Sequence, residues 1–394
     1  MLWQPPLPKR YTNLTDDQLI TEIDAQRADL GDQLVILGHH YQQDDVIRFA
    51  DFTGDSFKLS QLAAERVKKV GAKYVIFCGV HFMAESADIL TEDDVAVVLP
   101  DLSAGCSMAD MADYEDTIDA WQQIHHQLVN RDTTVVPICY MNCSAAIKAF
   151  CGEHGGAVCT SSNCQQILDW ALNGGALGGN GPVKVLFIPD QHLGRNTAAA
   201  MGYDVHTDMC VWDPKATQAL GGCDPQQIEN SSFLLWKGHC SVHKLFRPEH
   251  VDQIRAQWPD VTVLVHPEVC HEVVAKADLT GSTERIKTII EAAEPDTRWA
   301  VGTEVHMVHR LAQQAADRGV TVRMLSDCQC LCTTMYRIDM PHLLWTLDQL
   351  SQGKIVNQIS VKPQVKHWSL VALNRMLELT NTAPELQTTP AASR

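Results

Sequence analysis

Polar side chains that can transfer protons or bind ligands follow the apolar runs of this chain at repeated positions. After the first run of each third of the chain stand His39 and Tyr41, Tyr140 and Asn142, and His266 and Glu268. After the second runs stand Gly79 with His81, Thr160 with Ser161, and Gly281 with Ser282 and Thr283. Any one of these could be a cap or turn residue. Caps alone would not select His, Tyr and Glu, which exchange protons readily, so the recurrence predicts one shared site.

Three of the fourteen cysteines stand in small, polar contexts beside turns, namely Cys106, Cys240 and Cys332. Neighbouring Gly and Ser residues let backbone amides approach a metal-bound thiolate. A clustered ferredoxin run is absent from the sequence, so ligands this scattered have to be assembled by the fold. Other interpretations stay open: Cys106 and Cys240 could be ordinary buried thiols. Cys332, with Cys328 and Cys330, could form a zinc-binding or redox patch.

Short, nearly continuous apolar runs supply the strands that position these residues. They are QLVILG, KYVIFCG and VAVVLP, then TTVVPIC, GAVCT and VKVLFIP, then VTVLVH, KADLTG and TRWAVGT. Amphipathic stretches such as DSFKLSQLAAERVKKVG separate them. This alternation is typical of parallel sheets covered on both faces, with right-handed crossovers. Ligands of such sheets bind beyond the carboxyl ends of the strands, where the polar residues stand.

The fold class that we predict is α/β, with three pseudo-repeated three-layer α/β/α domains whose short parallel sheets surround a central active site. The length of 394 residues exceeds what one hydrophobic core usually supports. We expect an N-terminal segment over 1–30, domains over 31–120, 121–243 and 244–340, and C-terminal helices with a flexible tail over 341–394. Residues 380–394 lack apolar periodicity and are expected to be frayed.

Composition narrows the classes of function. The formal net charge of −17 argues against a sequence-independent nucleic-acid surface. An anionic substrate would need a pocket made locally positive by His, backbone amides and helix N-termini. Neither a secretory leader nor a membrane-length apolar stretch is evident, so we expect a cytoplasmic protein with no membrane contact. Its cysteines are then expected to be reduced thiols.

Specific strings make the chain resemble quinolinate synthase from about Thr15 to Leu379. They are ILGHHYQ, DFTGDSFKLS, CGVHFMAESADIL, LPDLSAGCSMAD, CYMNCSAAIKA, CTSSN, IPDQHLGRN, WKGHCSVH, HPEVC, ADLTGST and GTEVHMVHRL, in the family's order. The resemblance implies condensation of iminoaspartate with dihydroxyacetone phosphate to quinolinate, with loss of phosphate and two waters, in NAD biosynthesis. It also implies a [4Fe-4S] cluster with one open iron acting as a Lewis acid, held by three cysteines that fall on Cys106, Cys240 and Cys332.

The resemblance also implies roles for the residues at the strand ends. Proton shuttling falls to Tyr41 and Glu268, acid–base work or orientation near the open iron to Tyr140 and His243, and holding of the intermediate to Asn142. Substrate binding is implied for His39, Ser56, Tyr140, Met141, Asn142, Ser161, His266, Pro267, Glu268, Ser282 and Thr283. Small-molecule substrates are the expected partners. A transient hand-off of the imine from an aspartate oxidase or dehydrogenase is compatible with this, as is free diffusion.

The sequence departs from the family where relatives show Cys-x-x-Cys-x-x-Cys and this chain reads Cys328-Gln329-Cys330-Leu331-Cys332. Cys330 therefore rivals Cys332 as the third ligand.

Two other functions are compatible with the sequence. A zinc hydrolase or lyase could use His266, Glu268 and nearby thiols. An iron–sulfur sensor or carrier would need no pocket of Tyr, Asn and Glu, and a DNA-binding sensor would need a basic helix, which the sequence does not show.

Overall fold

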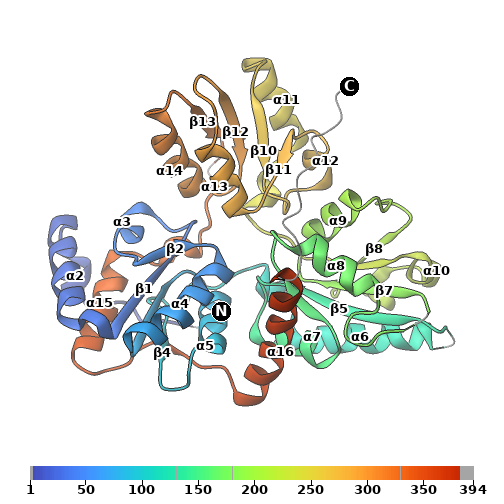
Figure 1. The fold of residues 1–394 in the computed structure, drawn as a ribbon, viewed down its shortest axis with the longest axis horizontal. Helices are drawn as coiled ribbons and strands as arrows, with labels where there is room; N and C mark the ends of the chain where they lie inside the picture. Colours follow the sequence, from blue (N-terminus) through green and yellow to red (C-terminus); the bar gives the residue numbers. More distant parts are fainter. Residues whose placement is uncertain (1–2, 130, 180, 329, 382–394) are drawn as a thin grey trace.

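A computed structural model of the chain describes residues 3–129, 131–179, 181–328 and 330–381. It has three lobes, each built on its own sheet (Figure 1). The predicted tail beyond residue 381 lies outside the described residues. None of the described helices has the length and apolar character needed to span a membrane.

The first sheet has the strand order β14-β4-β3-β1-β2. Its strands are β1 (Leu34–His39), β2 (Phe52–Gly54), β3 (Tyr74–Cys78), β4 (Ala96–Val98) and β14 (Gln358–Ile359). All are parallel except β14, which pairs antiparallel with β4. Its helices are α3 (Asp44–Ile47), α4 (Ser56–Val70) and α5 (His81–Leu90). Every residue of β1 is buried, as expected for a strand covered on both faces.

The second sheet is entirely parallel and has the order β6-β5-β7-β9-β8. Its strands are β5 (Thr134–Tyr140), β6 (Ala157–Cys159), β7 (Val183–Ile188), β8 (Met209–Trp212) and β9 (Phe233–Trp236). Its helices are α6 (Tyr114–Leu128), α7 (Ala145–Glu153), α8 (Cys164–Leu172), α9 (Gln191–Ala200) and α10 (Pro225–Asn230).

The third sheet is also parallel, with the order β11-β10-β12-β13. Its strands are β10 (Thr262–Val265), β11 (Leu279–Thr280), β12 (Arg298–Gly302) and β13 (Thr321–Met324). Its helices are α11 (Pro248–Gln257), α12 (His271–Val274), α13 (Thr283–Glu291) and α14 (Val305–Ala316). The predicted fold class, α/β with parallel-dominated sheets, is thus confirmed. The pseudo-repeat of three domains and the domain limits stay predictions.

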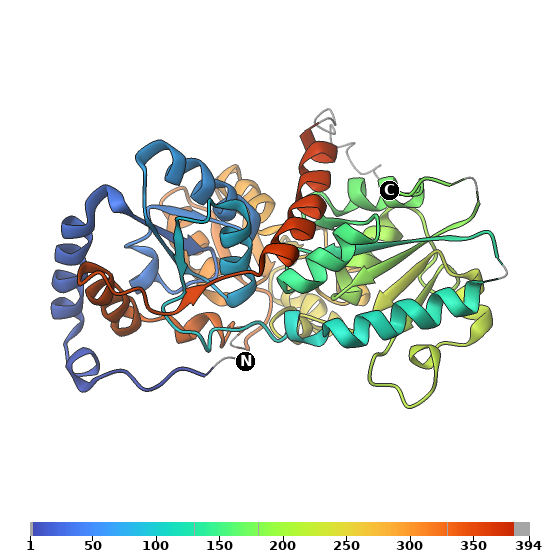
Figure 2. The same cartoon turned by 90° about the horizontal axis from the view of Figure 1, so that it is seen from below.

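The N-terminal helices pack with α15 (Met340–Ser351), and the C-terminal segment connects the first lobe, through β14, to the second lobe. The N-terminal helices are α1 (Lys9–Thr12) and α2 (Asp16–Leu30), and α16 (Pro363–Asn381) packs on α7 (Figure 2). A Cβ on Gly152 of α7 would lie 2.0 Å from the carbonyl oxygen of Trp368, so only glycine permits this close approach. One hydrophobic cluster runs through both of these lobes, whereas the third lobe has clusters of its own.

Candidate active site

A cavity lies beyond the carboxyl ends of the strands and encloses about 710 Å³ of space, including its opening to solvent. The predicted residues that line it are His39, Tyr41, Ser56, Cys106, Tyr140, Met141, Asn142, Ser161, Cys240, His266, Glu268, Thr283 and Cys332. All three lobes therefore contribute to one cavity.

Three predicted residues do not line this cavity. His243 lies behind Glu268 and contacts it directly. Pro267 and Ser282 line a neighbouring cleft between the second and third lobes, which shares Ser161 with the cavity. Their backbones border the cavity wall, because Glu268 and Thr283 follow them in sequence.

The loops after β1 and β10 place their polar side chains in the same way. The amide of Tyr41 donates to Nδ1 of His39 at 3.1 Å, and the amide of Glu268 donates to Nδ1 of His266 at 3.3 Å. Each histidine is thereby oriented by the residue two positions later. The first and third lobes therefore share not only the residue types at these strand ends but also the hydrogen bond that orients the histidine.

A chain of hydrogen bonds connects Tyr41 to Glu268 through two buried residues. The hydroxyls of Tyr41 and Thr303 lie 2.8 Å apart, Thr303 Oγ1 lies 3.1 Å from His243 Nε2, and His243 Nδ1 lies 2.7 Å from Glu268 Oε2. An ionised Glu268 can only accept, so Nδ1 carries a proton. In neutral His243, Nε2 then accepts from Thr303, which in turn accepts from Tyr41. In this state a proton can pass from Tyr41 through Thr303 to Nε2 of His243.

Burial sets the protonation of these groups. It raises the pKa of Tyr41 and of Tyr140, and nearby Glu268 raises both further, so both hydroxyls remain donors. Burial also lowers the pKa of His39 and of His266 to about 3. Glu268 is held ionised: burial opposes this, but His243, His266 and the Tyr140 hydroxyl together lower its pKa.

Thr303 was not identified from the sequence. It is fully buried and follows β12, the third strand of its lobe. The sequence pattern considered residues after the first and second runs of each unit, and TRWAVGT was recognised only as a strand. Extending the same rule to the third runs would have found it.

The three candidate thiols, Cys106, Cys240 and Cys332, share one loop geometry. Each stands three residues before a short 3-10 turn, over Ala109–Met111, His243–Leu245 and Met335–Arg337. The carbonyl oxygen of each cysteine accepts the amide of the fourth residue onward at 3.0 Å.

Burial raises the pKa of all three thiols, to about 12 for Cys106, while backbone amides act to lower it in each loop. The charge of Cys332 adds to this rise at Cys106 and at Cys240. Buried thiols beside amide donors suit metal ligation, because a metal ion supplies the positive charge that a thiolate needs. The donor set therefore fits a thiolate-bound metal centre.

The rival thiol Cys330 has a different environment. It is fully buried, and its sulfur lies 3.2 Å from that of the exposed Cys328. It is not among the described residues that line the cavity, whereas Cys332 is.

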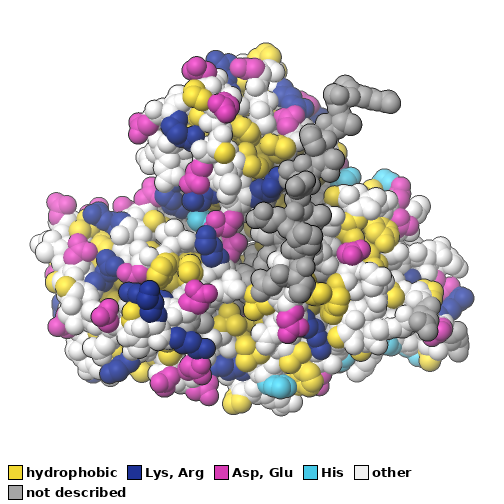
Figure 3. Space-filling model, viewed as in Figure 1, with side chains coloured by type: hydrophobic (Ala, Val, Ile, Leu, Met, Phe, Trp, Pro, Cys, Tyr) yellow, Lys and Arg dark blue, Asp and Glu magenta, His cyan; other side chains and the backbone are white. Residues whose placement is uncertain are grey.

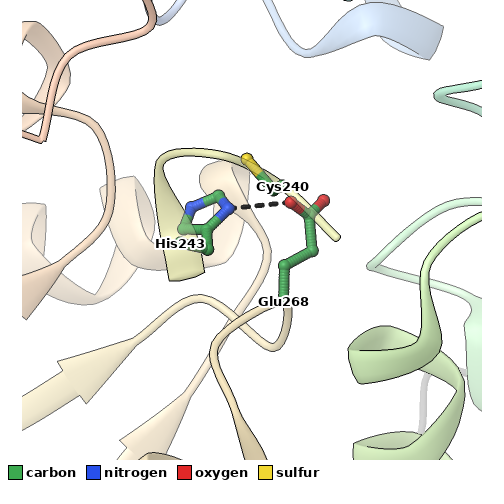
Figure 4. A group of neighbouring side chains, drawn as sticks. All are labelled: Cys240, His243 and Glu268. Carbon is green, nitrogen blue, oxygen red and sulfur yellow. Dashed lines mark hydrogen bonds and ion pairs between the residues drawn. The ribbon is translucent and has the colours of Figure 1, made fainter. Parts of the chain in front are cut away.

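Cys240, His243 and Glu268 form a further possible metal group (Figure 4). Their ligand atoms lie within 4.8 Å of one another. Cys240 and His243 come from the segment after β9, and Glu268 reaches them from the loop after β10.

Fold and site together define an α/β protein whose central cavity combines candidate metal-binding thiols with acid–base side chains. Residues 21–378 match the profile of the family described as Quinolinate synthetase A protein. The chain is 52% identical to the quinolinate synthase of Acidobacterium capsulatum over 369 residues, which cover 94% of this chain and 95% of that protein. It is 47% identical to that of Corynebacterium glutamicum over 391 residues, covering 99% and 94%. The chain therefore belongs to the quinolinate synthetase A family.

Proposed function

We propose that this chain condenses iminoaspartate with dihydroxyacetone phosphate to quinolinate, in the de novo synthesis of NAD. One phosphate and two waters leave, and no net electron transfer is needed. The observation that carries the proposal is the single cavity in which three thiols face the hydrogen-bond chain from Tyr41 to Glu268. Family membership supports it, because the relatives are named quinolinate synthase.

The proposed cofactor is a [4Fe-4S] cluster held by Cys106, Cys240 and Cys332. Three protein ligands leave one iron open, and this iron supplies Lewis-acid chemistry when the cluster is bound. The repeated loop geometry of these cysteines and their common place in the cavity wall support this ligand set.

The chain's own side chains would move the protons that condensation, ring closure and dehydration require. Tyr41 can release a proton from its hydroxyl through Thr303 to Nε2 of His243, and Glu268 stabilises the imidazolium that results. Tyr140 lines the same cavity as Glu268, which helps to keep its hydroxyl protonated by raising its pKa, and it is placed to act as an acid.

Substrate carboxylates and phosphate need hydrogen-bond donors. We propose that Asn142 and the backbone of Met141 hold the reaction intermediate. The remaining donors are His39, Ser56, Ser161, His266, Ser282 and Thr283, with the Pro267 segment shaping the wall. The fourteen cysteines are free, which suits the proposed cytoplasmic location. A hand-off of the imine by an aspartate-oxidising enzyme is an additional proposal.

The test is to purify the chain anaerobically, measure iron, sulfide and the visible spectrum, and assay quinolinate formation from freshly generated iminoaspartate. We expect a brown protein with about four irons per chain that makes quinolinate. Cys332→Ser should lose colour and activity, whereas Cys330→Ser should keep both. If instead Cys330→Ser loses colour and activity and Cys332→Ser keeps both, the third ligand is Cys330.

The Cys240, His243 and Glu268 group supports a second candidate, a zinc-dependent hydrolase or lyase, because all three are zinc ligands. A colourless, zinc-loaded preparation without quinolinate formation would favour it and contradict the proposed condensation.

A further inference from the structure

The cavity has little positive charge of its own. Among the described residues that line it there is no Lys or Arg, while Asp55 and Glu268 bring carboxyl groups. Nδ1 of His39 and Nδ1 of His266 each accept a backbone amide, so neither ring is protonated on both nitrogens and neither carries a charge. Both substrates of the proposed function are anions. A cation behind the cavity wall would resolve this mismatch.

Lys148 on α7 is such a cation. Its side chain is fully buried, which is rare for lysine. The Nζ group donates to the carbonyl oxygen of Cys143 at 2.5 Å and lies 5.5 Å from the centre of the Phe82 ring. Phe82 lines the cavity. One aromatic ring therefore separates the ammonium group from the substrate space, at a distance where cation and ring attract each other.

No carboxylate is paired directly with the ammonium group of Lys148 among the described residues. The acidic group nearby is Glu85, which accepts the amide of Ala145 at 2.9 Å, at the start of α7, and lies 3.9 Å from Nδ1 of His81. Glu85 therefore serves the helix terminus and His81. Burial raises the pKa of Cys143, and Lys148 works against this rise, as a positive centre does.

Lys148 also bears on the loop that carries predicted substrate contacts. Tyr140, Met141 and Asn142 line the cavity, and Cys143 follows them directly. The hydrogen bond from Lys148 to Cys143 ties the end of this loop to α7.

We propose that Lys148 is a positioning residue which supplies positive potential to the anionic substrates and fixes the loop from Tyr140 to Asn142. The inference rests on the proposed function, since that function makes the ligands anionic. A charge one ring away acts strongly because the intervening medium is protein rather than water. The sequence predicted a locally positive pocket but assigned its charge to histidines, amides and helix ends.

The chain offers a matched control in Lys184, which is the other buried lysine among the described residues. It is 5% exposed and donates to the carbonyl oxygens of Glu229 and Ser231, at the amino end of β7 away from the cavity. Lys148→Met and Lys184→Met each remove one buried charge at nearly constant shape. Lys148→Arg keeps the charge.

The test compares these variants as cluster-containing enzymes, by steady-state kinetics and by calorimetric titration with quinolinate. Lys148→Met is expected to raise the KM of the substrates and the Kd of quinolinate by about 10-fold or more, with kcat changed much less. Lys148→Arg should restore most of the affinity. Lys184→Met should lower the melting temperature and leave KM and Kd unchanged.

Unchanged KM and Kd in Lys148→Met, or equal changes in both methionine variants, would overturn the inference. If Lys148→Met does not fold, Lys148→Gln against Lys148→Arg gives the same comparison. A wild-type chain that makes no quinolinate would contradict the proposed function instead, and titration of the folded variants with inorganic phosphate would still test Lys148.

Discussion

At the scale of residues, the site depends on a few buried polar groups that have fixed directions of hydrogen bonding. Glu268 can only accept, so Nδ1 of His243 carries a proton, and while the ring is neutral its Nε2 accepts from Thr303, which accepts from Tyr41. Removing one member should therefore change proton transfer more than it changes the fold.

Tyr41→Phe removes one hydroxyl and keeps the ring. We expect turnover to fall by about 100-fold or more if this hydroxyl transfers a proton. The visible spectrum should stay unchanged, because Tyr41 is not a predicted metal ligand. Tyr74→Phe, at the amino end of β3, serves as control and should keep full activity. Near-normal activity of Tyr41→Phe would refute its role.

Thr303→Val keeps the shape of the side chain but interrupts the path between Tyr41 and His243. The expected loss of kcat is about 100-fold, comparable to other losses of a proton-transfer group. Thr303→Ser retains the hydroxyl and should recover most of the activity. Equal activity of the Val and Ser variants would show that the hydroxyl has no part in turnover.

His39 and His266 make stability depend on pH. Their folded pKa of about 3 lies below the unfolded value, so the unfolded chain binds more protons as pH falls. Above the pKa of the unfolded chain, the two neutral histidines cost the folded state nothing. Between that pKa and about pH 3, acidification protonates them in the unfolded chain only, which lowers the free energy of unfolding. At pH 5 the loss is about 2 kcal/mol for each histidine. Thermal unfolding of His266→Asn between pH 7 and 5 should show a weaker pH dependence than wild type, while the exposed His126→Asn should not.

At the scale of elements, helix α14 of the third lobe holds the loop of the first lobe that carries His39 and Tyr41. Arg310 donates to the carbonyl oxygens of His40 and Gln42, and pairs with Asp44 at 2.6 Å. The wall of the cavity is thus fixed by a residue that does not line it.

Arg310→Met should release this loop and leave its carbonyl groups without their donor, lowering stability by about 1–3 kcal/mol and reducing kcat. Arg318 gives a matched control, since it donates to the carbonyl oxygens of Ile290, Glu291 and Ala293 within the third lobe. Arg318→Met should lose stability and keep kcat. Kinetics and urea unfolding of both variants measure the difference, and an equal loss of kcat would contradict a positioning role for Arg310.

At the scale of the whole molecule, charged groups join the first lobe to the third. His40 Nε2 of the first lobe lies 2.7 Å from Glu284 of the third, and Lys58 Nζ lies 3.5 Å from the same carboxylate. The hydrogen bond from His40 is the main cause that lowers the pKa of Glu284, to about 2. Basic, acidic and histidine side chains meet between these two lobes on the face shown in Figure 3.

Glu284→Gln removes the charge of this bridge beside Thr283, which lines the cavity. We expect faster hydrogen exchange in the loop 39–43 and a KM raised by about 3- to 10-fold, because the lobes enclose the substrate less tightly. Glu291→Gln breaks an ion pair within α13 and is the control. Identical exchange and KM in both variants would show that the bridge does not hold the lobes.

The sequence by itself determined the strands and the residues at their ends. All the predicted strands are present, because continuous apolar runs between turn residues have few alternatives to burial in a parallel sheet. Strands β2, β8, β9, β13 and β14 were missed. Of these, β2 and β14 are very short. The placement of Cys106, Cys240 and Cys332 around one cavity followed the family's motifs.

Only the tertiary structure decided what lies behind the cavity wall. Thr303 and Arg310 act through contacts 60 to 270 residues apart in sequence, and Lys148 acts through a neighbouring ring. No local pattern encodes such distances. The sequence likewise did not determine whether the histidines are charged, because it shows where a histidine stands but not how deeply its ring is buried. Periodicity specifies which face of a strand or helix is buried; the partner that meets this face depends on how three separate sheets pack.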